Sequence, residues 1–170
     1  AAPAAPPPEA PPAPPTDPAA IALLATLQNI CIPATEGGSY AKLAKANGWR
    51  KSGDTFTYKG QGFQFSINPS PSNPTDCEVE ITSAVDPESP AKPLVIALHN
   101  WAALERGYSL YRNDKNVTGG LEYITRSWEH DDPGKHEALV LTTTRKADDT
   151  PMKRDADTSE MIYSETKTST

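Results

Sequence analysis

The sequence predicts an α+β protein in which an antiparallel sheet of about six strands packs on a central helix. Residues 89–107 form the clearest amphipathic helix, and strand-like segments lie on both sides of it. Those strands are grouped, whereas a parallel α/β sheet requires alternating strands and helices. Residues 77–82 alternate apolar and polar, as in a sheet with one solvated face. The predicted order is helix, helix, three strands, helix, three strands, with one disulfide.

The chain begins with an arm, residues 1–18, that is almost entirely Ala and Pro. Such a segment buries too little apolar surface to fold and favours extended polyproline conformations. We therefore expect a disordered arm, which acts either as a spacer or as a solvated terminus without a partner. A single domain is expected over residues 19–145.

Two short helices are expected at the start of this domain. Residues 19–31 carry Ile21, Leu24 and Leu27 at helical spacing, and Pro33 is expected to stop this helix. The second helix begins after Ser39 and ends at Gly48, a typical residue for a left-handed helix cap.

Three strands are expected next. Residues 55–58 and 63–67 flank a glycine-containing turn and predict a hairpin, and residues 77–82 form the third strand. In the third strand, the alternation points Cys77 into the core.

The central helix is expected to begin at Ser89 as N-cap, with Pro90 in its first turn, and to end before Gly107. Its apolar stripe must be buried against a sheet; it consists of Ala91, Leu94, Val95, Leu98, Trp101 and Ala102.

Three further strands, at 108–112, 121–128 and 137–144, are expected after the helix. Residues 146–170 are charged and nearly free of apolar side chains, so they predict a polar tail. At most a short edge strand near 160–166 is expected there. No internal repeat is apparent in the sequence.

Cys31 and Cys77 are the only cysteines. In an oxidising compartment such a pair predicts a disulfide, and in a reducing one it predicts two buried thiols. We favour the disulfide because Cys77 points inward from its strand, toward the end of the first helix.

Composition also bears on compartment and partners. Small residues such as Ala1 and Ala2 follow signal-peptide cleavage, so we expect an exported protein, periplasmic or secreted, although a trimmed chain would begin in the same way. The formal net charge of −6 argues against a nucleic-acid partner. No apolar run approaches the roughly 20 residues of a transmembrane helix, so no transmembrane segment is expected.

Three short segments resemble a group of small exported proteins of Gram-negative bacteria that have no assigned activity. They are Leu27–Cys31, Gly48–Trp49 and Cys77–Val79, within residues 20–85. The resemblance implies export and a disulfide, and it carries no catalytic motif.

His130, Asp131, Asp132 and His136 are the only clustered residues of metal-ligand types. Two imidazoles and two carboxylates around a Pro-Gly turn are candidate ligands for Zn²⁺ or a similar ion. The alternative is an ordinary polar hairpin tip, which we favour because a mobile tip lacks groups that orient the ligands. No cofactor is expected.

Two further groups of residues are candidates for a functional site. Glu78 and Glu80 share one strand face, where they serve either as an acid–base pair or as solvated surface. The aromatic residues are expected mainly in the core, unless several line an exposed sheet face and form a ligand or partner surface; the candidates are Trp101, Tyr108, Tyr123 and Trp128.

The sequence therefore favours an exported, envelope-associated accessory module that binds an unknown protein partner and carries no catalytic motif. A module that binds a small molecule or a metal is the first alternative. A hydrolase of wall polymers, with Glu78 and Glu80 as its candidate carboxylates, is the second.

Overall fold

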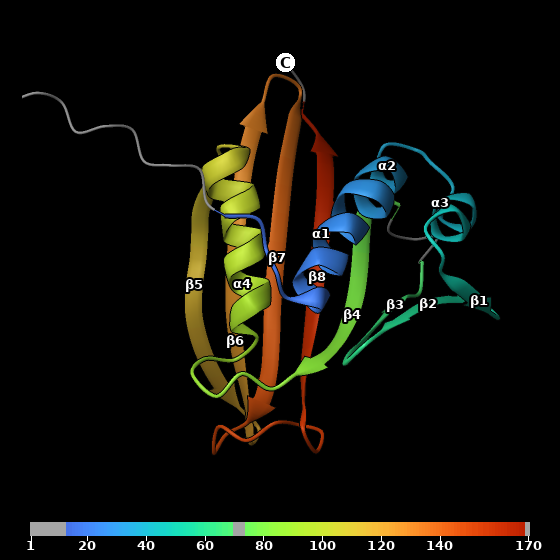
Figure 1. The fold of residues 1–170 in the computed structure, drawn as a ribbon. Helices are drawn as coiled ribbons and strands as arrows, with labels where there is room; N and C mark the ends of the chain where they lie inside the picture. Colours follow the sequence, from blue (N-terminus) through green and yellow to red (C-terminus); the bar gives the residue numbers. More distant parts are fainter. Residues whose placement is uncertain (1–12, 70–73, 169–170) are drawn as a thin grey trace, which may run out of the picture.

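A computed structural model describes residues 13–69 and 74–168, and it confirms the α+β class with an antiparallel sheet. The sheet has eight strands rather than about six, in the order β1-β2-β3-β4-β8-β7-β6-β5 (Figure 1). The expected arm falls largely on residues 1–12, outside the described residues. The strands are β1 (Arg50–Ser52), β2 (Thr55–Gly60), β3 (Phe63–Ile67), β4 (Asp76–Ala84), β5 (Ser109–Thr118), β6 (Leu121–Asp132), β7 (Lys135–Lys146) and β8 (Ala156–Lys167).

The first helix is longer than expected, because it passes through Pro33. It consists of α1 (Pro18–Thr26), the π-helical segment η1 (Leu27–Cys31) and α2 (Ile32–Thr35). In η1 the amide of Ile32 donates to the carbonyl of Leu27, one residue further back than in an α-helix. This wider turn precedes the proline, whose ring clashes with the backbone of a regular α-helix interior. The short helix α3 (Tyr40–Ala46) follows, capped by Ser39 as expected.

The helix between the two groups of strands begins later than expected. It consists of α4 (Lys92–His99) and the π-helical segment η2 (Asn100–Glu105). Ser89 does not cap it, because the carboxylate of Asp86 accepts hydrogen bonds from the amides of Glu88 and Ser89 and holds them in a turn. Ala91 then enters the helix with φ +52°.

Strand β8 is the largest departure from the expected order. The sequence predicts a polar tail over 146–170 with at most an edge strand, whereas β8 spans twelve residues in the interior of the sheet. It pairs with β4 on one side and with β7 on the other. Alternate residues of β8 are buried, from Asp157 to Glu165, and the residues between them face the opposite side of the sheet.

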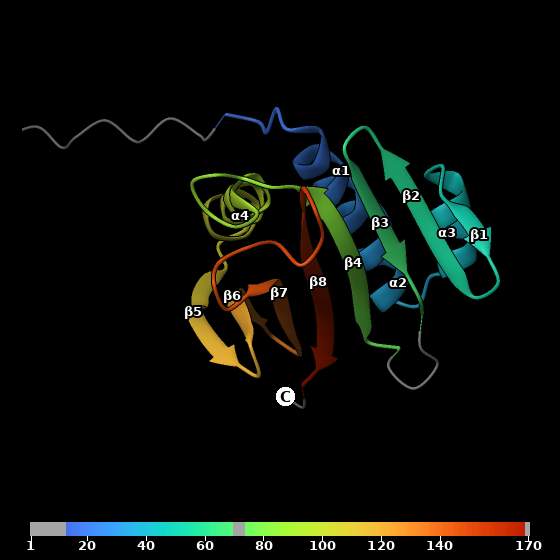
Figure 2. The ribbon, with the colours of Figure 1, turned by 90° about the horizontal axis from the view of Figure 1, so that it is seen from below.

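The strand order is symmetric about the β4–β8 pair. The first half has the helix α1–η1–α2, the short helix α3 and the four strands β1–β4; the second half has the helix α4–η2 and the four strands β5–β8. The last strands of the two halves pair antiparallel. Figure 1 shows α1 and α4 side by side on one face of the sheet, and Figure 2 shows the same arrangement from below.

The core lies between these helices and the sheet. Leu23, Leu27 and Leu98 from the helices are fully buried. They meet apolar cross-strand neighbours of the sheet. One such row is Trp128, Leu139, Tyr163 and Cys77, and the next is Leu141, Met161 and Val79.

The disulfide between Cys31 and Cys77 is confirmed. It joins the end of η1 to the start of β4, with a Cα–Cα distance of 5.2 Å, and both cysteines are buried. It therefore fastens the first helix to the middle of the sheet, and such bonds are typical of oxidising compartments.

One helix, Pro18–Thr35, is long and apolar enough by length and composition to cross a membrane. Its inward side chains, among them Leu23, Leu27 and Ile30, are fully buried in the core of the domain. In this fold it is therefore the core helix of the first half.

Candidate functional sites

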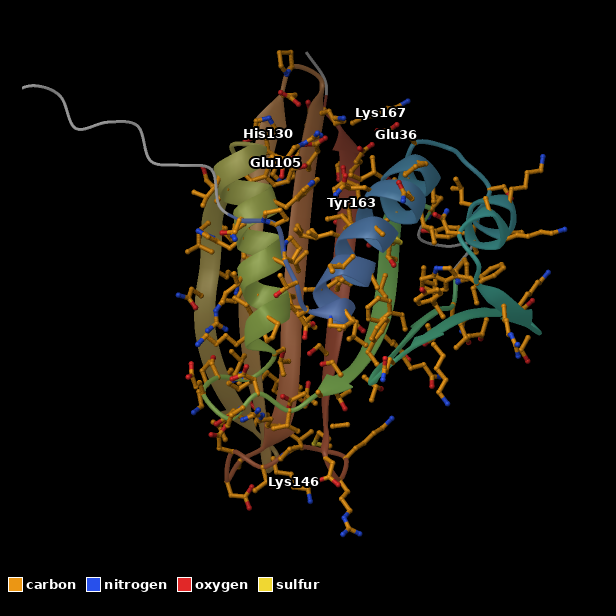
Figure 3. The ribbon with its side chains drawn as sticks, viewed as in Figure 1. Glu36, Glu105, His130, Lys146, Tyr163 and Lys167 are labelled. Carbon is orange, nitrogen blue, oxygen red and sulfur yellow. A yellow bond between two sulfur atoms is a disulfide. The ribbon has the colours of Figure 1, made fainter. Side chains whose placement is uncertain are left out.

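The helix-covered face of the sheet ends in polar groups at both extremities. At the end where the helices finish, six residues form what we call the Tyr108 cluster: Tyr108, His130, Lys135, Glu137, Tyr163 and Glu165. Figure 3 shows Tyr163, His130 and Glu36 at this end, with Lys146 at the opposite end.

Glu137 is the centre of the Tyr108 cluster. The Tyr108 hydroxyl donates to Glu137 Oε2 at 2.7 Å, and Lys135 Nζ lies 2.9 Å from Glu137 Oε1. Burial alone would raise the pKa of Glu137, but the hydrogen bonds from Lys135 and Tyr108 outweigh it and lower that pKa. Glu137 is therefore held as a buried carboxylate.

The second carboxylate of the cluster, Glu165, is the cross-strand neighbour of Glu137. Tyr163 donates to Glu165 at 2.7 Å, and Lys135 Nζ lies 3.5 Å from the same oxygen, so one lysine lies between two opposed carboxylates. Burial raises the pKa of Glu36, which lies nearby at the end of α2, and the adjacent Glu165 raises it further.

Both tyrosines of the cluster are poor acids. Burial raises the pKa of Tyr108 and of Tyr163 well above the usual value, and the hydrogen bond that each hydroxyl makes to a carboxylate is the second largest cause. Near neutral pH they therefore act as hydrogen-bond donors that orient the two glutamates.

The four residues predicted as metal ligands are divided between the two faces of the sheet. Strands β6 and β7 remain paired up to Asp132 and Lys135, so alternate residues point to opposite sides. His130 and Asp132 lie on the helix-covered face, 3.0 Å apart between Nε2 and Oδ1. Asp131 and His136 contact one another on the other face.

On the helix-covered face, Glu137 joins His130 and Asp132. One potential ligand atom from each of the three lies within 4.8 Å of the other two. Glu137 was not among the sequence candidates; an alternating strand from residue 135 would have placed it on the face of His130, but the pairing register is needed to bring them together.

The predicted aromatic surface is dispersed. Trp101 and Trp128 are buried, and Trp128 donates from Nε1 to His99 Nδ1 at 3.1 Å. Tyr108 belongs to the Tyr108 cluster, and Tyr123 lies on the opposite face of the sheet. These four residues therefore line no common surface.

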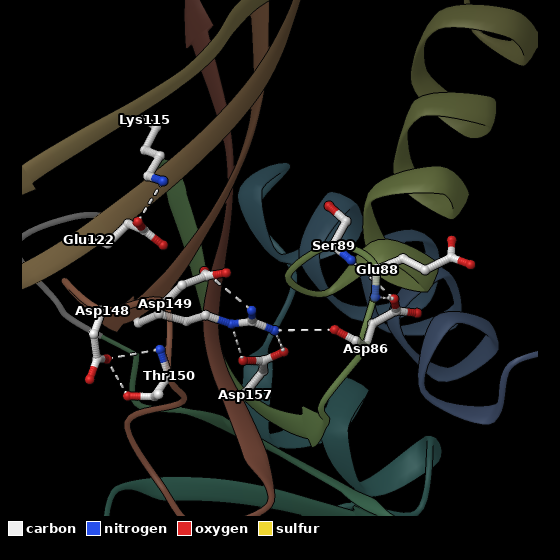
Figure 4. A network of polar contacts seen from close by, with 10 residues as sticks. Asp86, Glu88, Ser89, Lys115, Glu122, Asp148, Asp149, Thr150 and Asp157 are labelled. Atoms are coloured by element: carbon white, nitrogen blue, oxygen red, sulfur yellow. Dashed lines mark hydrogen bonds and ion pairs between the residues drawn. The ribbon is translucent and has the colours of Figure 1, made fainter.

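The opposite extremity of the helix-covered face carries a buried ion pair (Figure 4). Arg145 and Asp157 form two hydrogen bonds of 2.9 Å each, and their side chains are 6% and 0% exposed. Asp149 and the carbonyl of Asp86 complete the surroundings of the guanidinium. These contacts tie the β7–β8 connection to the segment before α4.

The other face of the sheet is covered by none of the described helices (Figures 1 and 2). It contains a shallow groove of about 600 Å³, which we call the open-face groove. Its lining is mostly polar and comes from five strands and the β7–β8 connection, which contributes Lys153; the strand residues are Gln64, Ser66, Glu80, Ile81, Thr82, Tyr123, Thr142, Thr144, Thr158, Ser159 and Glu160.

Three carboxylates meet on this open face. Glu80 and Glu160 are direct cross-strand partners, and Glu78 lies two residues from Glu80 on the same strand. Burial raises the pKa of Glu160, and the charges of Glu78 and Glu80 raise it further. In the described part of the chain, none of the three forms an ion pair.

A nucleophile beside a histidine base is not found among residues 13–69 and 74–168. His99 accepts from Trp128, and the other two histidines contact aspartates. Both cysteines are oxidised to the disulfide. The described sites therefore offer ligand-binding groups and carboxylates rather than a nucleophilic dyad.

No protein-family model matches this chain, and no curated protein matches it. The resemblance to small exported proteins of Gram-negative bacteria remains a prediction.

Proposed function

We propose that this protein is an exported accessory module, periplasmic or secreted, that binds a basic segment of another protein in the open-face groove. The supporting observation is the group of three unpaired carboxylates, Glu78, Glu80 and Glu160, on an uncovered polar sheet face. Like charges placed opposite one another on neighbouring strands destabilise a sheet. A partner that supplies lysine or arginine side chains would relieve this repulsion.

The shape of the groove favours an extended segment over a compact small molecule. Five strands line it, and neighbouring strands lie about 4.8 Å apart, so it extends roughly 19 Å across the sheet. An extended chain of about six residues covers this length. Hydroxyl groups from Ser66 and Thr142 can donate to or accept from its backbone.

The disulfide supports the proposed compartment. Bonds such as Cys31–Cys77 persist outside the reducing cytosol, and the net charge of −6 suits a basic partner. Periplasmic or secreted location and attachment to the cell envelope are parts of this proposal.

A hydrolase of wall polymers is the second candidate, because Glu80 and Glu160 could act as a carboxylate pair. A glycosidase requires one carboxyl group with a raised pKa beside an ionised one, and the pKa of Glu160 is raised. This candidate requires turnover of a polysaccharide, whereas the first requires only binding.

A charge-neutralising double variant tests the proposal. We expect a deca-lysine peptide at low salt to bind the wild-type chain, and Glu80→Gln/Glu160→Gln to weaken that binding at least tenfold in calorimetry. Glu105→Gln, an exposed carboxylate at the end of η2, serves as the matched control and should bind as the wild type does.

A photo-crosslinker at Thr142 on the open face, with one at Ile96 on α4 as control, then identifies the protein partner in envelope extracts. Equal crosslinking from both positions, or deca-lysine binding unaffected by the double variant, would contradict the proposal. Release of soluble sugars from wall polymers by the wild type but not by the double variant would favour the hydrolase.

A further inference from the structure

We propose that His130, Asp132 and Glu137 bind a divalent transition-metal ion of the Zn²⁺ class at the rim of the Tyr108 cluster. One imidazole and two carboxylates are the ligand types that such ions accept. The site lies on the helix-covered face, away from the open-face groove, so it is independent of the proposed partner binding.

The backbone places the three ligands without a mobile loop. His130 and Asp132 are two residues apart on β6 and share one face, and Glu137 is the direct cross-strand partner of His130. The turn between the strands consists only of Pro133 and Gly134, and Gly134 adopts φ +82°. Because the strands stay paired up to this turn, the ligands stand on rigid elements.

The distances require only a small contraction. The potential ligand atoms lie within 4.8 Å of one another. In a tetrahedral site with bonds of about 2.0–2.1 Å, ligand atoms lie about 3.4 Å apart. His130 Nε2 and Asp132 Oδ1 already lie 3.0 Å apart, and the Asp132 side chain, 49% exposed, has room to adjust toward Glu137.

Tyr108 supplies the outer support that a metal site needs. Its hydroxyl fixes Glu137 Oε2 at 2.7 Å, and its ring stacks on the His130 imidazole with centroids 5.1 Å apart and planes 8° apart. One residue thus orients two of the three ligands, as outer-shell groups do in metal centres.

Lys135 currently neutralises the site, since its ammonium lies 2.9 Å from Glu137 Oε1. A bound metal ion would take over this charge, and Lys135, 35% exposed, would turn toward solvent or remain with Glu165. Binding also requires His130 in its neutral form, because the metal ligand is the deprotonated ring nitrogen. A water molecule from the exposed side of Asp132 would provide the fourth ligand.

The test uses the full chain freed of metal by a chelator and titrated with ZnCl₂ against a chromophoric chelator. We expect one equivalent of Zn²⁺ to bind, and His130→Ala to weaken binding by at least tenfold. Tyr108→Phe should weaken it about tenfold, because it removes only the outer support. Lys135→Met should strengthen binding, because it removes the competing ammonium.

The hairpin provides its own matched controls. Asp131→Asn and His136→Ala change the same residue types on the opposite face and should leave the Zn²⁺ affinity within twofold of the wild type. Circular dichroism shows whether each variant is folded. The proposal is overturned if the folded wild type binds no stoichiometric Zn²⁺. It is also overturned if His136→Ala weakens binding as much as His130→Ala does.

Discussion

Arg145 and Asp157 illustrate, at the scale of single residues, how this fold accommodates charge inside a core. Asp157 is fully buried, and it follows a segment rich in charged residues that shows no apolar periodicity. Removing one partner of a buried pair leaves an uncompensated charge in a medium of low polarity. The cost is therefore far larger than for a pair on the surface.

We expect Asp157→Asn to lower the free energy of unfolding by about 3–5 kcal/mol, measured by urea denaturation. Asp114→Asn, which breaks the exposed pair with Arg112, is the control and should change stability little. The double variant Arg145→Met/Asp157→Leu should recover most of the loss, because no buried charge is left unpaired; Asp149, which also contacts Arg145, is 63% exposed. Equal losses for the buried and the exposed single variants would contradict this account.

Glu160 makes the stability of the fold depend on pH, and the direction of its pKa shift sets the sign of this dependence. Since its pKa is higher in the folded chain than in the unfolded chain, the folded state favours the protonated form. Its contribution to stability is fully present below the unfolded pKa and is lost as the pH rises through the folded value.

Glu160→Gln should therefore stabilise the chain at pH 7 by about 0.5 kcal/mol, the scale of one unfavourable cross-strand pair. The gain should disappear below about pH 4, where the glutamate is protonated in both states. Thermal denaturation of both chains across this pH range measures it. A gain that persists unchanged at low pH would show that charge repulsion is not the cause.

The candidate metal site shows what residue types alone predict. Two histidines and two aspartates lie close together in the sequence around Pro133, and strand alternation separates them into two pairs on opposite faces. Glu137 and Tyr108 were not recognised as neighbours of His130. Their approach depends on the register of β6 against β7 and on the end of η2, which local patterns do not encode.

At the scale of elements, the Cys31–Cys77 disulfide is the feature that the sequence predicts most directly. The alternation of β4 pointed Cys77 inward, and the first helix presents Cys31 to it. The bond closes a loop over a sequence separation of 46 residues. In the chain-entropy model, closing this loop lowers the conformational entropy of the unfolded chain and so stabilises the fold by about 4 kcal/mol.

Reduction, or the double variant Cys31→Ala/Cys77→Ala, should therefore lower the free energy of unfolding by about 4 kcal/mol. Guanidinium denaturation with and without dithiothreitol measures the effect, and the reductant should leave the double variant unchanged. Coincident unfolding curves for oxidised and reduced wild type would show that the bond constrains the unfolded chain little.

Strand β8 and the full length of the first helix are not predicted from the sequence. The sequence does not predict β8 as an interior strand, because Asp157, Ser159 and Glu165 occupy inward positions and are residues typical of a solvated segment. These residues are buried because partners from other elements satisfy them. Likewise, Pro33 does not end the first helix, because η1 widens the turn before it.

At the scale of the whole molecule, the class and the antiparallel pairing follow from the sequence, but the symmetric strand order does not. The two halves share a succession of elements rather than a pattern of residues, so no repeat is visible in the sequence. Only the pairing of β4 with β8 makes the correspondence evident.

The seam between β4 and β8 resembles the contact between two subunits of a dimer, with α1 and α4 packed above it. In a dimer such a contact would form by encounter of separate molecules, and its occupancy would fall on dilution. Here residues 85–91 connect the two halves, so β4 and β8 belong to one chain and pair intramolecularly. The short connection fixes the effective concentration of one half relative to the other. The sheet therefore remains whole at any protein concentration.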